Sequence, residues 1–146
     1  MIRKFLILLT LAFAFILPGA ASADTWYYGT NGSDHITGGY DADHMLGYNS
    51  GDYLNGMQQV DELKGGYGDD KLYGGTSTDW LYGMNDDDEL VGEAHEDWLF
   101  GGYQNDRIIS WHDYRRDFVD GGPGWDTCYV DDWDEVHDCE ATYKGW

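Results

Sequence analysis

Aspartate recurs at every ninth residue across half of the sequence, and this spacing is the strongest chemical signal in the chain. Nine consecutive members of the series are Asp34, Asp43, Asp52, Asp61, Asp70, Asp79, Asp88, Asp97 and Asp106. Further along, Asp117 and Asp126 each precede an apolar residue by two positions, as the members of the series do. Carboxylates repeated in this way supply rows of oxygen ligands, which hard divalent cations prefer. The spacing therefore predicts metal binding.

Two other residue types keep the same nine-residue register. Each unit begins with glycine, at Gly29, Gly38, Gly47, Gly56, Gly65, Gly74, Gly83, Gly92 and Gly101. The eighth position is always apolar, at Ile36, Met45, Leu54, Leu63, Leu72, Leu81, Leu90, Leu99 and Ile108. Nine units cover residues 29–109, and less regular units follow, beginning with eleven residues at 110–120.

A nine-residue unit bounded by glycine has room for a tight turn and a strand of three or four residues, but not for a helical hairpin. Side chains alternate between the two faces of such a strand, so position 8 points inward while positions 7 and 9 point outward. Two units complete one coil, and successive coils stack through parallel strands. The sequence predicts an all-β fold, a parallel β-roll (β-solenoid) with two repeats per coil.

In this arrangement the aspartates form one row along each edge of the roll. The rows are Asp34, Asp52, Asp70, Asp88, Asp106 and Asp126 on one edge and Asp43, Asp61, Asp79, Asp97 and Asp117 on the other. Two carboxylates about 5 Å apart repel by roughly 3 kcal/mol at an effective dielectric of about 20. Calcium between coils would reverse this repulsion, and magnesium fits less well because it requires near-octahedral geometry. The alternative is a solvated acidic surface, which would have no reason to keep a register.

Two units match a known repeat at every defined position. They are Gly65-Gly66-Tyr67-Gly68-Asp69-Asp70-Lys71-Leu72-Tyr73 and Gly121-Gly122-Pro123-Gly124-Trp125-Asp126-Thr127-Cys128-Tyr129. The pattern resembles the hemolysin-type calcium-binding repeat, also called the RTX nonapeptide, whose family fold is the parallel β-roll. The resemblance implies several Ca²⁺ ions held by the two aspartate rows and by glycine-rich turns, with Gly66 and Gly68 among the metal-site residues.

Other units depart from this motif. Its second glycine is replaced by Thr30, Tyr48, Met57, Met84 and Glu93, and its fourth position is glycine only at Gly32, Gly68 and Gly124. Asp41 and Asp86 can adopt the left-handed backbone of that position, and we expect Gln59, His95 and Gln104 to adopt it less readily. We therefore expect fewer calcium sites than units, with the unit at Gly56 empty.

The N-terminal segment has the pattern of a targeting sequence. Arg3 and Lys4 precede an apolar run at residues 5–17, and small residues follow up to Ala23. This predicts a secretory signal peptide at residues 1–23 and a single domain at residues 24–146. A retained membrane anchor is the alternative, but the run is short of the roughly 20 residues that span a bilayer. We expect a secreted, extracellular protein, with the periplasm and the cell surface as alternatives.

The net charge limits the classes of binding partner, and the cysteine content predicts a disulfide. The formal charge is −20, and −22 once residues 1–23 are removed, so nucleic acid and anionic membranes are excluded as partners. Cys128 and Cys139 are the only cysteines, and in an exported chain they predict one disulfide. A thiolate metal site is the alternative.

Four aromatic residues, Trp80, Tyr82, Trp98 and Phe100, occupy outward positions of neighbouring strands in the predicted roll. They suit a glycan or protein partner, and cross-strand pairing that only stabilises the sheet is the alternative.

No catalytic constellation stands out, and the five histidines share no register. No toxin, protease or lipase domain accompanies the repeats, so we expect no enzymatic activity. The predicted function is that of a secreted, non-enzymatic calcium-binding module that folds when it binds Ca²⁺. The main alternative is an adhesive or carbohydrate-binding module in which calcium is only structural. Ice binding and a small hydrolase rank below it, because the outward Thr and Asn array is too small and catalytic residues are lacking.

Overall fold

A computed structural model gives the structure of the chain, and it describes residues 24–145. The predicted signal peptide at residues 1–23 lies outside this part. Within residues 24–145, no helix is long and apolar enough to cross a membrane.

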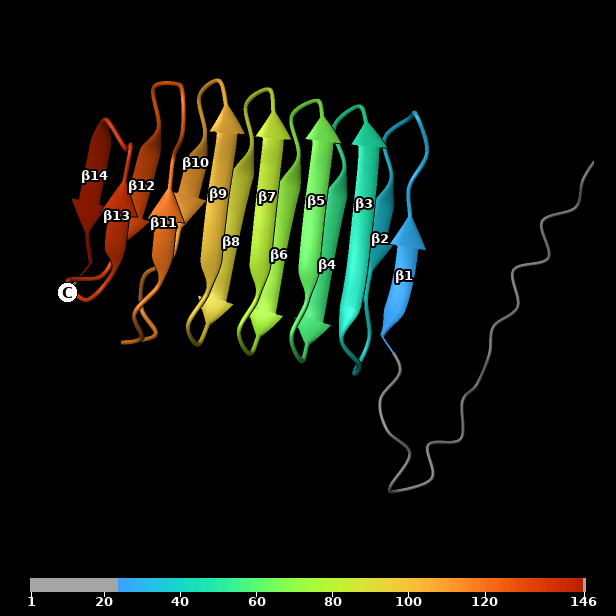
Figure 1. Cartoon of the computed structure of the whole chain (residues 1–146), viewed down its shortest axis with the longest axis horizontal. Helices are drawn as coiled ribbons and strands as arrows, with labels where there is room; N and C mark the ends of the chain where they lie inside the picture. Colours follow the sequence, from blue (N-terminus) through green and yellow to red (C-terminus); the bar gives the residue numbers. More distant parts are fainter. Residues whose placement is uncertain (1–23, 146) are drawn as a thin grey trace, which may run out of the picture.

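The fold consists of two parallel seven-stranded sheets, which confirms the predicted β-solenoid (Figure 1). Sheet A contains, in spatial order, β1 (Thr25–Tyr28), β3 (Asp43–Asn49), β5 (Glu62–Tyr67), β7 (Trp80–Asn85), β9 (Trp98–Tyr103), β11 (Phe118–Asp120) and β13 (Glu135–His137). Sheet B contains β14 (Ala141–Lys144), β12 (Thr127–Val130), β10 (Arg107–Ile109), β8 (Glu89–Ala94), β6 (Lys71–Thr76), β4 (Tyr53–Gln58) and β2 (His35–Thr37).

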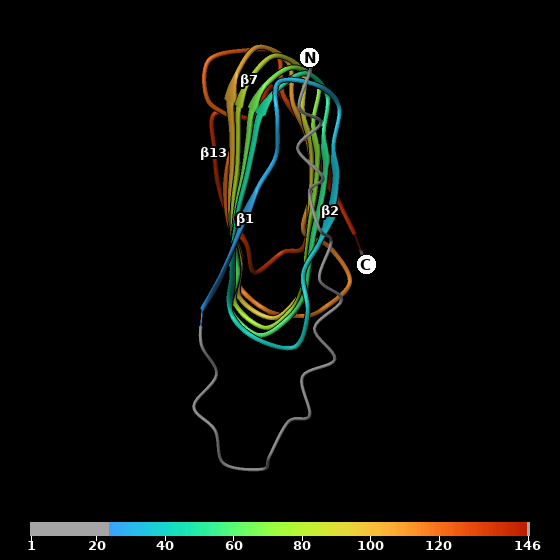
Figure 2. The same ribbon diagram turned by 90° about the vertical axis from the view of Figure 1, so that its right-hand side faces the viewer.

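Each coil runs along one strand of sheet A, turns, and returns along one strand of sheet B. Seen end-on, the coils superimpose as a flattened ring (Figure 2). The register advances by eighteen residues per coil, so that Leu63 pairs with Leu81 and Leu54 pairs with Leu72. Identical repeat positions therefore stack on one another from β1 to β10.

The eighth positions of the repeat form the core. Leu54, Leu63, Leu72, Leu81 and Leu90 are all 0% exposed, as alternation along each strand predicts. Because the sheets lie back to back, one inward side chain per strand is enough to fill the interior. The core is a narrow stack of aliphatic layers, and it leaves the turns at the two edges of the roll to carry polar chemistry.

The eleven-residue unit at 110–120 fits without disturbing this register. Trp98 still pairs with Phe118 and Arg107 with Thr127, so the two extra residues are accommodated in the turn between β10 and β11. His112 and Tyr114 in that turn both have a positive φ. An insertion in a turn thus leaves the strand ladder intact.

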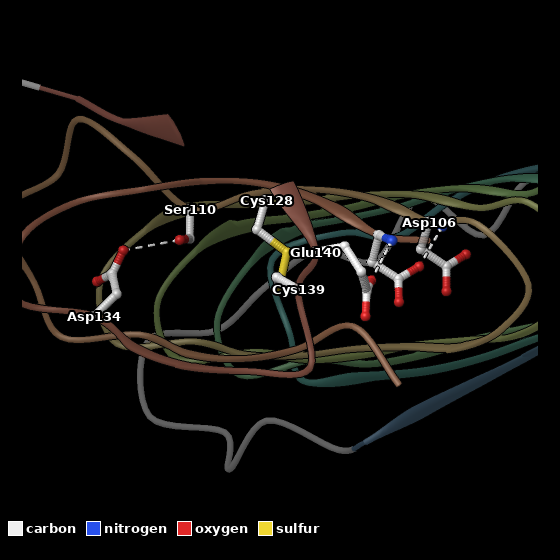
Figure 3. The surroundings of a disulfide bond; sticks show 7 residues. Asp106, Ser110, Cys128, Asp134, Cys139 and Glu140 are labelled. Atoms are coloured by element: carbon white, nitrogen blue, oxygen red, sulfur yellow. Dashed lines mark hydrogen bonds between the residues drawn. A yellow bond between two sulfur atoms is a disulfide. The ribbon is translucent and has the colours of Figure 1, made fainter. Parts of the chain in front are cut away.

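The two ends of the roll differ. At the C-terminal end, the disulfide Cys128–Cys139 joins β12 to the segment between β13 and β14 and crosses the interior of the last coil (Figure 3). At the other end, β1 and β2 are the outermost strands of their sheets. Residues 25–28 and 141–144 both extend the sheets, as the terminal strands β1 and β14.

Candidate metal centre

The two stacks of turns carry the two predicted aspartate rows. We call the stack of turns that leads into sheet B edge I, and the stack that leads into sheet A edge II; they lie at the top and bottom of Figure 1. Edge I carries Asp34, Asp52, Asp70, Asp88, Asp106 and Asp126, and edge II carries Asp43, Asp61, Asp79, Asp97 and Asp117. The existence of both rows is therefore confirmed.

Each aspartate row is also a ladder of hydrogen bonds. The backbone N–H of Asp52 donates to Oδ1 of Asp70 at 2.7 Å, and the N–H of Asp61 donates to Oδ1 of Asp79 at 2.8 Å. All nine such steps along the two rows measure 2.7–2.8 Å. One oxygen of each of these carboxylates is therefore satisfied by the preceding coil, which the sequence analysis did not foresee.

The other carboxylate oxygen is buried without a partner. This holds for Oδ2 of Asp52, Asp61, Asp70, Asp79, Asp88, Asp97, Asp106 and Asp126. A buried acceptor without a donor costs about 1–3 kcal/mol, and more when it is charged. Each row thus presents a regular series of oxygens that lack a positive partner.

Backbone carbonyls converge on these unpartnered oxygens. A Cβ placed on Gly47 would lie 2.3 Å from Oδ2 of Asp52 and 2.6 Å from the carbonyl oxygen of Gly65 in the next coil. On edge II, a Cβ on Gly56 would lie 2.3 Å from Oδ2 of Asp61 and 2.7 Å from the carbonyl oxygen of Gly74. Only glycine fits at these first positions, and each leaves a carboxylate and a carbonyl oxygen beside the same point.

From Tyr48 to Gly102, the second positions of the repeat adopt a left-handed backbone in both edges. Gly66 has a φ of +126°, and a Cβ there would lie 2.3 Å from the carbonyl oxygen of Tyr48. Tyr48 itself has a φ of +84°, as it occupies the same position one coil earlier. From Tyr48 to Gly102 on edge I, and from Gly39 to Glu93 on edge II, larger residues and glycines alternate, so every second coil provides the space that its neighbours need.

The fourth positions correct one expectation. Gln59, His95 and Gln104 have φ values of +67°, +89° and +76°, and Asp86 has +77°. The three residues therefore adopt the left-handed region as fully as Asp86, whereas Asp41 is not among the positive-φ residues of the described chain. Stacking between coils fixes the backbone here and overrides the preference of the residue type.

Burial raises the pKa of the central aspartates on both edges. It raises the pKa of Asp97 to about 9, that of Asp79 and Asp88 to about 8, and that of Asp70 to about 7. The backbone N–H bond to each carboxylate lowers its pKa, but desolvation is the larger effect. A nearby cation would favour the ionised form of these groups instead.

No cluster of three or more His, Cys, Asp or Glu side chains is arranged as a metal site within residues 24–145. Any ion bound along the rows would therefore take much of its coordination from backbone carbonyls, which calcium accepts readily. The thiolate alternative is wrong, because both cysteines are joined in the disulfide.

Edge I carries a second, outer row of polar side chains that the sequence analysis missed. The N–H of Asp87 donates to Oδ1 of Asp69 at 3.3 Å, and the N–H of Asn105 donates to Oδ1 of Asp87 at 2.9 Å. Oδ2 of Asp86 accepts from the N–H of Gly68 at 2.9 Å. The signal that could have identified this row is acidic or amide residues at the fourth and fifth positions of alternate units.

Each inner row ends in an acidic residue that was not among the predicted site residues. On edge II, Asp134 accepts from the N–H of Asp117 at 3.0 Å and from the hydroxyl of Ser110 at 2.9 Å. On edge I, Glu140 accepts from the N–H of Asp126 at 2.8 Å, beside the disulfide (Figure 3). Asp134 keeps the two-residue offset to Val136, but nothing in the repeat pattern indicates Glu140.

The predicted aromatic group lies on the outer face of sheet A in adjacent rows, as expected. Trp80 stacks on Trp98 with ring centroids 5.2 Å apart, and Tyr82 stacks on Phe100 at 5.1 Å. All four side chains are half-buried, because their ring faces cover one another. They are therefore not a flat, open platform, and the cross-strand pairing that we considered as the alternative is present.

Comparison with known protein families gave one match. The sequence model of the RTX calcium-binding nonapeptide repeat matches four times, at residues 28–63, 55–90, 82–110 and 115–132. Together these segments cover more than half of the chain. Comparison with curated proteins and with solved structures gave no match.

Proposed function

This chain belongs to the family of RTX calcium-binding nonapeptide repeat proteins, and we propose that it is a secreted, non-enzymatic β-roll that binds several Ca²⁺ ions and folds as it binds them. Secretion is supported by the pattern of residues 1–23 and by the disulfide, which suits an oxidising compartment.

One observation carries the proposal: the row of buried carboxylate oxygens without a donor, most of them beside a backbone carbonyl. Asp70 and Asp88 on edge I and Asp79 and Asp97 on edge II are the central members. All the available donor atoms are oxygens, which fits a hard cation, and irregular geometry favours calcium over magnesium. When bound, the ion supplies the positive charge that these carboxylates lack.

Coupling between binding and folding follows from the origin of the ligands. The carboxylate of Asp52 and the carbonyl of Gly65 belong to neighbouring coils, so they meet only when the coils are stacked. An ion that binds only the folded state stabilises it by about 1.4 kcal/mol per site at tenfold Kd. Several weak sites together can therefore decide whether the roll is folded.

The sites are proposed to differ in affinity. The unit at Gly56 has the same inner pair of oxygens as the others, since Oδ2 of Asp61 faces the carbonyl of Gly74. Its turn, however, carries Gln58, Gln59 and Val60 and adds no negative charge. We retain it as the weakest site of the roll.

The test is a calcium titration of the purified protein with its disulfide intact, followed by far-ultraviolet circular dichroism. Starting from an EDTA-treated sample, Ca²⁺ should produce a cooperative gain of β signal, and Mg²⁺ at the same concentration should not. A matched variant, Asp70→Asn with Asp88→Asn, should shift the calcium midpoint to higher concentration. A protein that is fully folded in EDTA and unaffected by calcium would refute the proposal.

A further inference from the structure

The aromatic row on the outer face of sheet A is interrupted at one strand. On one side of the interruption Trp26 stacks on His44, with ring centroids 4.2 Å apart. On the other side Trp80 stacks on Trp98. Between them, β5 contributes Glu62, which pairs in register with His44 and with Trp80. One ring is therefore missing from an otherwise stacked row.

The interruption forms a hollow of about 380 Å³ on this face. His44 and Glu62 line one side of it, and Trp80 and Tyr82 line the other. Trp98 covers one face of the Trp80 ring, so the opposite face is the one turned toward β5. An aromatic wall thus borders a space large enough for a small ligand.

The polar groups of the hollow are paired with one another. Oε1 of Glu62 lies 2.6 Å from Nζ of Lys64, and Oε2 lies 2.9 Å from Nδ1 of His44. The ammonium group of Lys64 therefore neutralises this carboxylate locally. Donors and acceptors therefore stand side by side, which suits hydroxyl groups because a hydroxyl both donates and accepts.

We propose that the hollow between Glu62 and Trp80 binds a ring of a neutral carbohydrate, with the ring's C–H face on the indole and its hydroxyls on the Glu62–Lys64–His44 group. The formal charge of −20 disfavours anionic sugars. Glu62 is paired with Lys64, and the carboxylate of Asp24, which also lines the hollow, lies 4.0 Å from Nε2 of His44. Both of these carboxylates therefore already have a nitrogen partner, which disfavours an organic cation. The hollow borders edge II, since Asp61 contributes to its lining, but none of the side chains proposed to contact the sugar belongs to the aspartate rows.

A second hollow supplies a matched control. It measures about 290 Å³ and lies near the C-terminal end of the same face, where Trp98 and Phe118 meet Arg116 and Glu135. Glu135 occupies the same position of its strand as Glu62 does in β5. It also pairs with a basic side chain, that of Arg116, as Glu62 pairs with Lys64. The two positions can therefore receive the same substitution.

The decisive variant is Glu62→Phe, which places a ring where the row lacks one and fills the hollow. Calcium-loaded protein is titrated calorimetrically with glucose, galactose, mannose, N-acetylglucosamine and their neutral disaccharides, and a single bound ring should give a Kd on the order of millimolar. Glu62→Phe should weaken binding at least tenfold, whereas Glu135→Phe should leave it within twofold. Trp80→Leu, which removes the wall, should also abolish it.

Circular dichroism in calcium shows that each variant is folded, so a loss of sugar binding is not confused with a loss of the roll. The proposal is overturned if no neutral sugar binds the wild-type protein, or if Glu62→Phe binds as well as the wild type. Binding of tetramethylammonium that competes with or replaces sugar binding would also overturn it, because the hollow would then be a cation site. None of these outcomes affects the calcium titration.

Discussion

Edge I and edge II are built from the same six-residue turn, yet they present different chemistry to solvent. Both carry an inner row of buried aspartates with Oδ1 bonded to the preceding coil. Edge I adds the outer row that includes Asp69, Asp86 and Asp87. Edge II has one comparable link, from the N–H of His95 to Oδ2 of Asp113, and places Thr78 and Glu96 at the fifth position of its central turns. The inner row is therefore the part that the fold requires.

The difference between the edges separates two functions of the repeat, the fastening of one coil to the next and the adjustment of ion affinity. The inner aspartates fasten each coil to the next through a backbone N–H, so they are structural as well as candidate ligands. The outer residues of edge I, such as Asp87, are exposed and can change without loss of a core contact. Ion affinity can thus be adjusted at one edge while the stacking of coils stays the same at both.

The largest expected effect is the pH dependence of stability without metal, and it tests whether the inner rows of the two edges are equivalent. Because burial raises the pKa of Asp88 to about 8 and that of Asp97 to about 9 from 3.8, the folded state without metal binds more protons than the unfolded state. The free energy of unfolding in EDTA should therefore fall by several kcal/mol as the pH rises from about 4 through about 9. Far-ultraviolet circular dichroism of the EDTA-treated protein across this range measures it, as a β signal present at low pH that is lost as the pH rises.

Asp88→Asn and Asp97→Asn should each make this pH dependence shallower, since an amide does not titrate. In calcium the dependence should reverse, because protons then compete with the ion for the same oxygens. Metal-free stability that rises with pH would contradict the raised pKa values, and a response to only one of the two variants would show that the edges differ in their inner rows.

A smaller effect is expected from the second glycine of the repeat. Gly66→Ala on edge I and Gly75→Ala on edge II would place a Cβ 2.3 and 2.4 Å from a carbonyl oxygen of the preceding coil, at φ values of +126° and +111°. Each should lower the free energy of unfolding by about 3 kcal/mol. The control Gly39→Ala meets nothing within 4 Å and should change it by less than about 0.5 kcal/mol.

Chemical denaturation in calcium measures the three glycine variants. Equal losses at Gly66 and Gly75 would support equivalent inner architecture at the two edges. A cost at Gly39 equal to the other two would mean that the turn itself requires glycine, and not the close approach between coils.

The smallest effect isolates the outer row. The double change Asp69→Asn and Asp87→Asn keeps the side-chain oxygens that accept the N–H bonds of the row but removes two charges. Calcium affinity should fall by about three- to tenfold while circular dichroism in saturating calcium stays the same. Glu96→Gln at the corresponding position of edge II should change the affinity less, and calorimetric titration compares the variants. Equal effects at the two edges would remove the distinction drawn between them.

The sequence predicted the fold because its strongest signals are the ones that the fold uses. The eighth positions, such as Leu63 and Leu81, are buried and stacked, and the sixth positions line the two edges. Both follow from alternation along a strand and from a constant repeat length. The number of residues per coil was therefore enough to place every aspartate of the regular repeats.

Other features depend on neighbouring coils and could not be read from single units. The left-handed backbone of Gln59 and His95 is imposed by stacking and contradicts their own preference. Glu140 ends the edge I row because the disulfide segment brings it there, outside any repeat. Stacking of Trp80 on Trp98 depends on side-chain rotamers, so the aromatic surface was predicted in place but not in exposure.

Because the register repeats every eighteen residues, the length of the roll can change by whole coils while the structure of each remaining coil stays the same. Removal of residues 56–73 would join Asn55 directly to Gly74, shorten both rows by one aspartate, and leave every remaining side chain on its original face. It would also bring the strand of Trp80 beside that of His44 and so close the gap at Glu62. Gain or loss of whole coils by duplication or deletion in the gene is thus a change that the fold can absorb in one step, and the number of ion sites would change with it.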